Sequence, residues 1–120
     1  MKENILIDKS LAFALRIVKL KKHLVKEYKE YDIASQILRS GTSIGANINE
    51  ANYGSSTADF VAKLQIARKE CAETEYWLKL LFLSDYIKEK EFNDILQDCQ
   101  DLKNILTASI KTTKKSEQQK

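Results

Sequence analysis

Apolar residues recur every three or four positions in four segments of the chain, the spacing of one face of an α-helix. In the segment from Ser10 to Tyr28 they form two stripes roughly 140° apart, at about 100° per residue. The first stripe is Leu11, Leu15, Val18 and Val25, and the second is Phe13, Ile17, Leu20 and Leu24. Because one stripe is enough to pack a helix into a small bundle, the extra stripe predicts an oligomer.

A second helix is expected to begin near Asp32, a residue type that caps helix N-termini. Its apolar stripe is Ile33, Ile37, Gly41, Ile44, Ile48 and Ala51. The break that follows contains Gly54, which can take a left-handed conformation at a helix C-terminus, and Ser56 or Thr57 can cap the next helix.

The third helix is expected over Thr57 to Ser84 and the fourth over about Glu89 to Thr112. The third carries a narrower second stripe, formed by Ile66, Trp77 and Leu80. Four helices with short connections predict an all-α fold, an up-down-up-down antiparallel four-helix bundle. Residues 1–110 would form this single domain.

The composition agrees with long helices, since the 120 residues include no proline and three glycines. No apolar run approaches the roughly 18 residues of a membrane span, and the N-terminus does not resemble a signal peptide. We therefore expect a cytoplasmic protein with no membrane association. In that compartment Cys71 and Cys99, each within an apolar pattern, would be reduced core residues.

Positive charge is concentrated in two places. Residues 9–30 hold seven Lys or Arg and two Glu, and residues 111–120 hold four Lys and one Glu. The latter stretch has no periodicity, which predicts a disordered basic tail. A lysine-rich surface is either an ordinary solvated face or a binding surface for phosphates or an acidic partner. The candidate phosphate contacts are Arg16, Lys19, Lys22, Lys26, Lys111, Lys114 and Lys115.

Residues that could form a catalytic or metal site are sparse. The single histidine, His23, lies on the lysine-rich face, so a Ser-His-Asp arrangement is improbable. Glu70 and Glu73 have no histidine in register for a di-metal site, and neither cysteine has a partner at zinc-ligand spacing. We expect a non-enzymatic protein with no metal and no cofactor.

The stretch "RSGTSIGANINEANYGSS" raises the question of a phosphate-binding loop. It has neither the glycine spacing nor the lysine of a P-loop, and it lacks the glycine triplet of a dinucleotide fingerprint. The helical stripe continues through it instead. Gly41 and Gly45, four residues apart, predict a close helix crossing.

A polar arc follows the same helix, formed by Gln36, Arg39, Ser40, Ser43, Asn47 and Glu50. Three interpretations remain open: a solvated face, a ligand site, or a hydrogen-bonded network at a helix or subunit interface. Partners on the third helix would be Arg68, Glu70 or Glu73. The candidate network is Arg39, Ser43, Asn47, Glu50, Arg68 and Glu73.

The segment "SQILRSGTSIGANINEANYGSSTADFVAKLQIARKECAETE" resembles the bacterial 23S ribosomal RNA intervening-sequence proteins. Their pattern is Arg, then Ser-Ile-Pro-x-Asn-Ile-x-Glu-Gly, a Gly-Ser break, and a helix with Ala-Arg and a later Glu. The matching residues are Arg39, Ser43, Ile44, Asn47, Ile48, Glu50, Gly54, Ala67, Arg68 and Glu73. Gly45 replaces the family's proline and Ala51 its glycine.

The resemblance implies a cytoplasmic bundle that assembles as a homo-oligomer, a five-membered ring in related proteins, with no established catalytic residues. Distant relatives, the accessory proteins of diversity-generating retroelements, resemble basic barrels that engage nucleic acid and a reverse transcriptase. The leading hypothesis is a non-enzymatic accessory protein that binds the backbone of RNA or DNA. The alternative is a scaffold, or a subunit that binds a protein partner, with no nucleic-acid role.

Overall fold

Helix α1 extends over Lys2–Tyr28 and begins well before Ser10, where the apolar pattern predicts its start. The computed structural model describes residues 2–118, with side chains from residue 5 onward. The stripe of α1 that contains Ile17 and Leu24 is buried, whereas Leu11 and Leu15 are 60% and 57% exposed. The bundle thus buries one predicted stripe and leaves much of the other in solvent.

A tight turn leads from α1 into α2, which extends over Asp32–Ala51. Lys29 has a φ of 55°, and the N–H of Glu30 bonds to the carbonyl of Leu24 at 3.2 Å, which closes the C-terminus of α1. The carboxylate of Glu30 then accepts the N–H of Ala34 at 3.0 Å. The expected cap, Asp32, lies one position inside α2, so the turn preceding the helix supplies this bond.

Helix α3 extends over Thr57–Leu83, with Ser56 at its N-cap. The Ser56 hydroxyl accepts the N–H of Asp59 at 3.1 Å, so the predicted serine cap is confirmed. The left-handed conformation expected at Gly54 is wrong, because none of the three glycines, all in the described part of the chain, has a positive φ. The N–H of Gly54 instead continues the helical turn to the carbonyl of Ala51 at 3.2 Å.

Helix α4 extends over Glu89–Gln118, so most of the stretch expected as a disordered tail is helical here. Residues 119–120 of that prediction lie outside the described residues. Ser109 and Ile110 are still buried near this end of α4, and the polar residues beyond them extend the helix into solvent. The structure therefore differs from the sequence prediction over 111–118.

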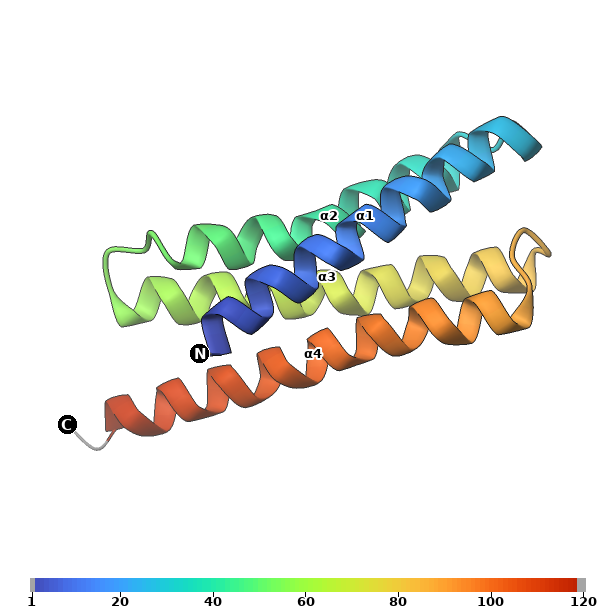
Figure 1. The fold of residues 1–120 in the computed structure, drawn as a ribbon. Coiled ribbons are helices and arrows are strands. Elements are labelled where there is room, and N and C mark those ends of the chain that lie inside the picture. The colour runs from blue at the N-terminus through green and yellow to red at the C-terminus, as the bar shows by residue number, and fades with distance from the viewer. Residues whose placement is uncertain (1, 119–120) are drawn as a thin grey trace.

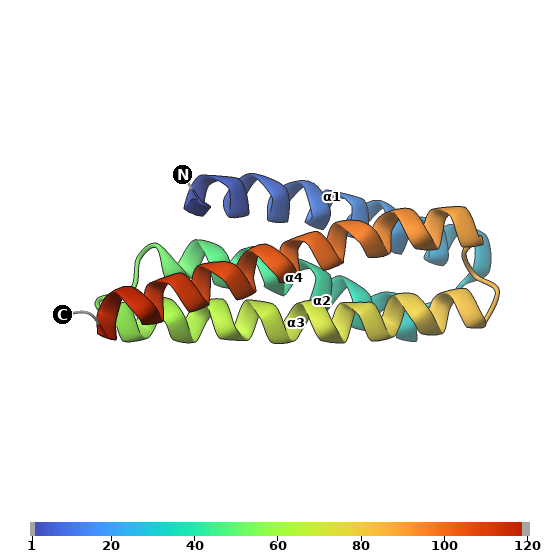
Figure 2. The ribbon, with the colours of Figure 1, turned by 90° about the horizontal axis from the view of Figure 1, so that it is seen from below.

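The four helices form an all-α, up-down-up-down antiparallel bundle with extents of 54 × 23 × 20 Å (Figures 1 and 2). The first turn of α1 and the last turn of α4 lie toward the end that holds the α2–α3 turn, opposite the α1–α2 and α3–α4 turns (Figure 1). Helix α2 packs closely on both α1 and α3, whereas α1 and α4 are the least closely packed neighbours. One side of the bundle is consequently closed and the other is open.

Two features of the core match the sequence analysis. A Cβ added at Gly41 would lie 2.8 Å from Ile17 Cγ1, and one at Gly45 would lie 3.2 Å from Ser10 Oγ, so both glycines sit where α2 crosses α1. Cys71 and Cys99 are free and buried. Hydrogen bonding with Cys71 and burial raise the pKa of the Cys99 thiol, which keeps it protonated and unreactive.

Candidate functional site

The predicted polar network lies in part along the seam between α2 and α3. The Arg39 guanidinium pairs with Glu73 and lies 3.5 Å from a carboxylate oxygen of Glu70. The indole of Trp77 also donates to Glu73, at 3.1 Å. The bonds from Trp77 and Arg39 lower the pKa of Glu73, and the bond to Glu73 raises the pKa of Arg39. Glu73 is thus held as an anion by donors from two helices, Arg39 of α2 and Trp77 of α3.

Two further residues of the arc have partners, one within α2 and one on α3. Asn47 donates from Nδ2 to the carbonyl of Ser43 at 2.9 Å, a bond within α2 itself. Glu50 accepts from Lys63 at 2.8 Å. This pairing was missed by the sequence analysis, although Lys63 precedes Glu70 by two helical turns and so shares its face of α3. The arc therefore combines a helix–helix seam with an ordinary solvated edge.

Arg68 does not join this seam. Glu75 accepts a hydrogen bond from Lys103 of α4 at 2.7 Å, so it lies on the side of α3 that faces α4. Arg68 precedes Glu75 by two helical turns and therefore shares that side. A buried contact takes its place between α2 and α3, where the Thr74 hydroxyl donates to that of Ser40 at 3.0 Å. Ser40 belonged to the predicted arc, and Thr74 recurs at helical spacing with the buried apolar residues Ala67, Cys71 and Leu78 of α3.

Arg16 is not available as a phosphate contact. Its guanidinium crosses from α1 to α4 and pairs with Asp98 at 2.6 Å and Asp94 at 3.0 Å. Partial burial opposes the charge of Arg16, but its bonds to Asp98 and then Asp94 raise its pKa overall. Arg16 acts as a strut between the two helices.

The other candidate phosphate contacts fall into two separate groups. Lys19, Lys22 and Lys26, the α1 lysine row, are exposed on one face of α1 within about 60° of arc, and none forms an ion pair with a described residue. The tail lysines are Lys111, Lys114 and Lys115, exposed near the C-terminus of α4. Because the helices are antiparallel, the two groups lie toward opposite ends of the bundle and form no common patch.

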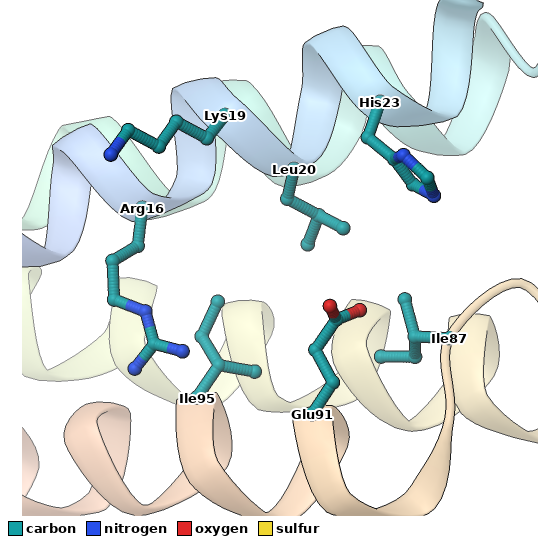
Figure 3. Close-up of a pocket in the computed structure, with 7 residues that line it drawn as sticks. All are labelled: Arg16, Lys19, Leu20, His23, Ile87, Glu91 and Ile95. Atoms are coloured by element: carbon teal, nitrogen blue, oxygen red, sulfur yellow. The ribbon is translucent and has the colours of Figure 1, made fainter. Parts of the chain in front are cut away.

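A groove runs between α1 and α4 on the open side of the bundle. Its central cavity, of about 350 Å³, has an apolar floor of Leu20, Ile87 and Ile95. Figure 3 shows His23 and Leu20 pointing from α1 toward α4, with Glu91 and Ile95 pointing back, while Lys19 stays close to α1. Adjoining cavities of about 1000 Å³ and 220 Å³ extend the groove in both directions, and the Arg16 strut lines all three.

The two walls of this α1–α4 groove carry opposite charges. Helix α1 supplies the cations Lys9, Arg16 and Lys19, with His23 beside them, and α4 supplies the acids Glu91, Asp94, Asp98 and Asp101. The exception is the end near the α3–α4 turn, where Lys88 and Lys90 also line the groove. Apolar periodicity does not predict such a groove, because it indicates which face of a helix is buried and not how far apart two helices lie. A volume near 350 Å³ with an apolar floor and polar walls is within the range of small-ligand sites.

Metal-ligand clusters and membrane-spanning helices are both absent from the described residues. Within residues 2–118, no three His, Cys, Asp or Glu side chains come together in a way that could hold a metal ion. Among the same residues, none of the helices combines the length and apolar character that crossing a membrane requires.

Comparison with known proteins identifies close relatives of the chain. The sequence model of the 23S rRNA-intervening sequence protein family matches residues 2–108. The crystal structure of a protein of unknown function from the S23 ribosomal protein family of Bacteroides thetaiotaomicron is similar, with a TM-score of 0.91 and 53% identity. The similarity covers 92% of this chain and 99% of that one. Among curated proteins, none matches the chain.

Proposed function

Because the chain belongs to the 23S rRNA-intervening sequence protein family, we propose that it is a non-enzymatic accessory protein that binds the backbone of RNA or DNA. The α1 lysine row is the observation that carries this proposal. Lys19 and Lys26 are separated by two helical turns, roughly 10 Å, so the row can contact successive phosphates of one strand. Neighbouring acids neutralise Arg16 but leave this row free.

The proposal includes assembly of several copies in the cytoplasm. Helix α1 exposes Leu11 and Leu15, and α3, diagonally opposite in the bundle, exposes Tyr76 and Leu83. Two different apolar faces on opposite sides of a subunit favour head-to-tail contacts, which close into a ring. The family resemblance suggests five copies. Each ring would then repeat the α1 lysine row around its axis.

A salt titration tests the nucleic-acid role. We expect a labelled strand to bind at about 50 mM salt and to weaken with a log–log slope of about −2 if three phosphates are neutralised. Replacing the α1 lysine row by Lys19→Glu, Lys22→Glu and Lys26→Glu should abolish binding. The matched control reverses the tail lysines with the same number of charges and should leave most of the affinity.

The outcomes separate the two functional hypotheses. Absence of binding at low salt, or equal loss in both triple variants, would contradict the nucleic-acid role. The scaffold alternative would then be favoured if a protein partner is recovered after nuclease treatment and lost with Leu11→Glu. Light scattering tests assembly, and a stable monomer at micromolar concentration would refute the ring.

A further inference from the structure

The largest of the three cavities along the α1–α4 groove lies beside the end of α1 and the α3–α4 turn. This turn-end cavity has a volume of about 1000 Å³ and is lined by residues from α1, the turn and α4. The lining residues that matter for a ligand are Tyr28, Tyr86, Lys88, Lys90, Asn93 and Gln97. Aromatic, cationic and amide groups thus meet in one cavity, away from the polar seam of α2 and α3.

Tyr28 is held in place and still accessible. Its ring meets Tyr86 edge-to-face, with centroids 5.2 Å apart and planes at 85°, and meets His23 at 5.9 Å and 79°. Despite these two contacts, Tyr28 is 48% exposed. A ring ordered by its neighbours and nearly half free offers a stacking surface at little entropic cost.

Charges of both signs line the cavity. Lys88 and Lys90 line it beside the α3–α4 turn, whereas Lys26, two residues before Tyr28, leaves α1 roughly 200° around the helix from it, so a strand would have to pass around the end of α1 to reach both. Glu91 and Asp94 line the α4 wall, where they would repel a bare anion. Their carboxylates, with the amides of Asn93 and Gln97, can instead bond to the N–H and carbonyl groups of a base edge.

We propose that the turn-end cavity binds an unpaired nucleobase of a single-stranded nucleic acid, with the base stacked on Tyr28 and adjacent phosphates on the α1 lysine row. This inference rests on the proposed function and adds to it a preference for single strands. A duplex holds its bases in the stack and can reach only the lysines. Stacking tolerates every base, so the site discriminates between strand states more than between sequences.

The test compares one strand of about 12 nucleotides with its duplex, by fluorescence anisotropy at low salt. Ribose and deoxyribose versions of the strand show whether the 2′-hydroxyl contributes. We expect the single strand to bind more tightly than the duplex. Tyr28→Ala should weaken single-strand binding by roughly 5- to 150-fold, the loss of one base–aromatic stack, and leave duplex binding unchanged.

Two variants separate the loss of the Tyr28 ring from other effects of substituting a tyrosine. Tyr28→Phe keeps the ring and should bind like the wild type. Tyr53→Ala removes a tyrosine that is 88% exposed in the α2–α3 turn, at the opposite end of the bundle, and should have no effect. If Tyr28→Ala fails to fold, photocrosslinking of a 5-iodouridine strand to the wild-type protein should still map to Tyr28.

Each negative binding result has a different consequence for the proposed function and for this inference. Binding of neither strand nor duplex overturns the proposed function and this inference together. Equal binding of strand and duplex that needs the α1 lysine row but not Tyr28 leaves the proposed function standing and overturns the inference. A crosslink that maps outside the turn-end cavity would also overturn it.

Discussion

Two arginines each pair with two acids on a neighbouring helix, yet they cross very different spaces. Arg39 lies at the exposed edge of the closed seam between α2 and α3, next in sequence to Ser40, whose contact with Thr74 is buried. Arg16 spans the α1–α4 groove, with a cavity on either side of it. The same ion-pair chemistry seals a packed interface in one place and holds an open groove at a set width in the other.

This difference suggests that the closed side supports the stability of the fold and the open side supports ligand binding. Substitutions on the closed side should reduce the free energy of unfolding, because they disturb close packing. Substitutions on the open side should change ligand binding and leave stability nearly intact, because surface ion pairs contribute little.

The largest effect is expected where α2 crosses α1. Gly41→Ala places a methyl group 2.8 Å from the buried side chain of Ile17, and we expect a net loss of about 1–2 kcal/mol after the gain in helix propensity. Urea denaturation measures it. Gly45→Ala is the control, because the added methyl group would lie 3.2 Å from its nearest neighbour, the Ser10 hydroxyl. Its free energy of unfolding should stay near that of the wild type. Equal effects at the two sites would contradict the packing argument.

Next in size is the buried hydroxyl pair between α2 and α3. Thr74→Val preserves the shape of the side chain but leaves the Ser40 hydroxyl without its 3.0 Å partner, at a cost of about 1 kcal/mol. Thr107→Val, which removes an exposed hydroxyl bonded within α4, serves as the control in the same denaturation series. A Thr74→Val protein as stable as the wild type would mean that the seam is not closed.

A smaller effect is expected for the strut on the open side. Arg16→Gln should cost at most about 1 kcal/mol, since Arg16 is partly exposed and its partners Asp94 and Asp98 remain solvated. About 1 M salt should remove most of the difference from the wild type by screening the pairs. A loss several times larger, insensitive to salt, would show that the groove is part of the core.

The smallest effect concerns pH. The folded state lowers the pKa of Glu73, so it binds fewer protons than the unfolded chain in acid, and the stability that Glu73 contributes is lost as pH falls through its folded pKa. Between neutral pH and the ordinary glutamate range this contribution should be constant. Glu73→Gln should therefore flatten the acid limb of a stability–pH curve. An unchanged limb would mean that Trp77 and Arg39 do not hold the carboxylate.

How much of this was predictable differs between the two sides. Periodicity gave the four helices and the closed side, because Gly41, Ile44 and Ile48 recur on the face that becomes buried. The pairing of Arg39 with Glu73 was likewise within reach, since Arg39 stood on the polar arc of the second helix and Glu73 was among its expected partners on the third. The open side could not be predicted from the sequence. The distance between α1 and α4 depends on how α1 crosses α2, and so does the pairing of Arg16 with Asp94 and Asp98. The helical end of α4 was missed because a polar, aperiodic stretch gives no packing signal.

Hydrogen–deuterium exchange with and without a bound single strand tests most directly whether binding is confined to the open side of the bundle. We predict that the strand slows amide exchange in residues 19–28 and 85–94, around the α1 lysine row and the turn-end cavity, and leaves α2 and the middle of α3 unchanged. Slowed exchange confined to the α2–α3 seam, with none at the α1–α4 groove, would contradict the account.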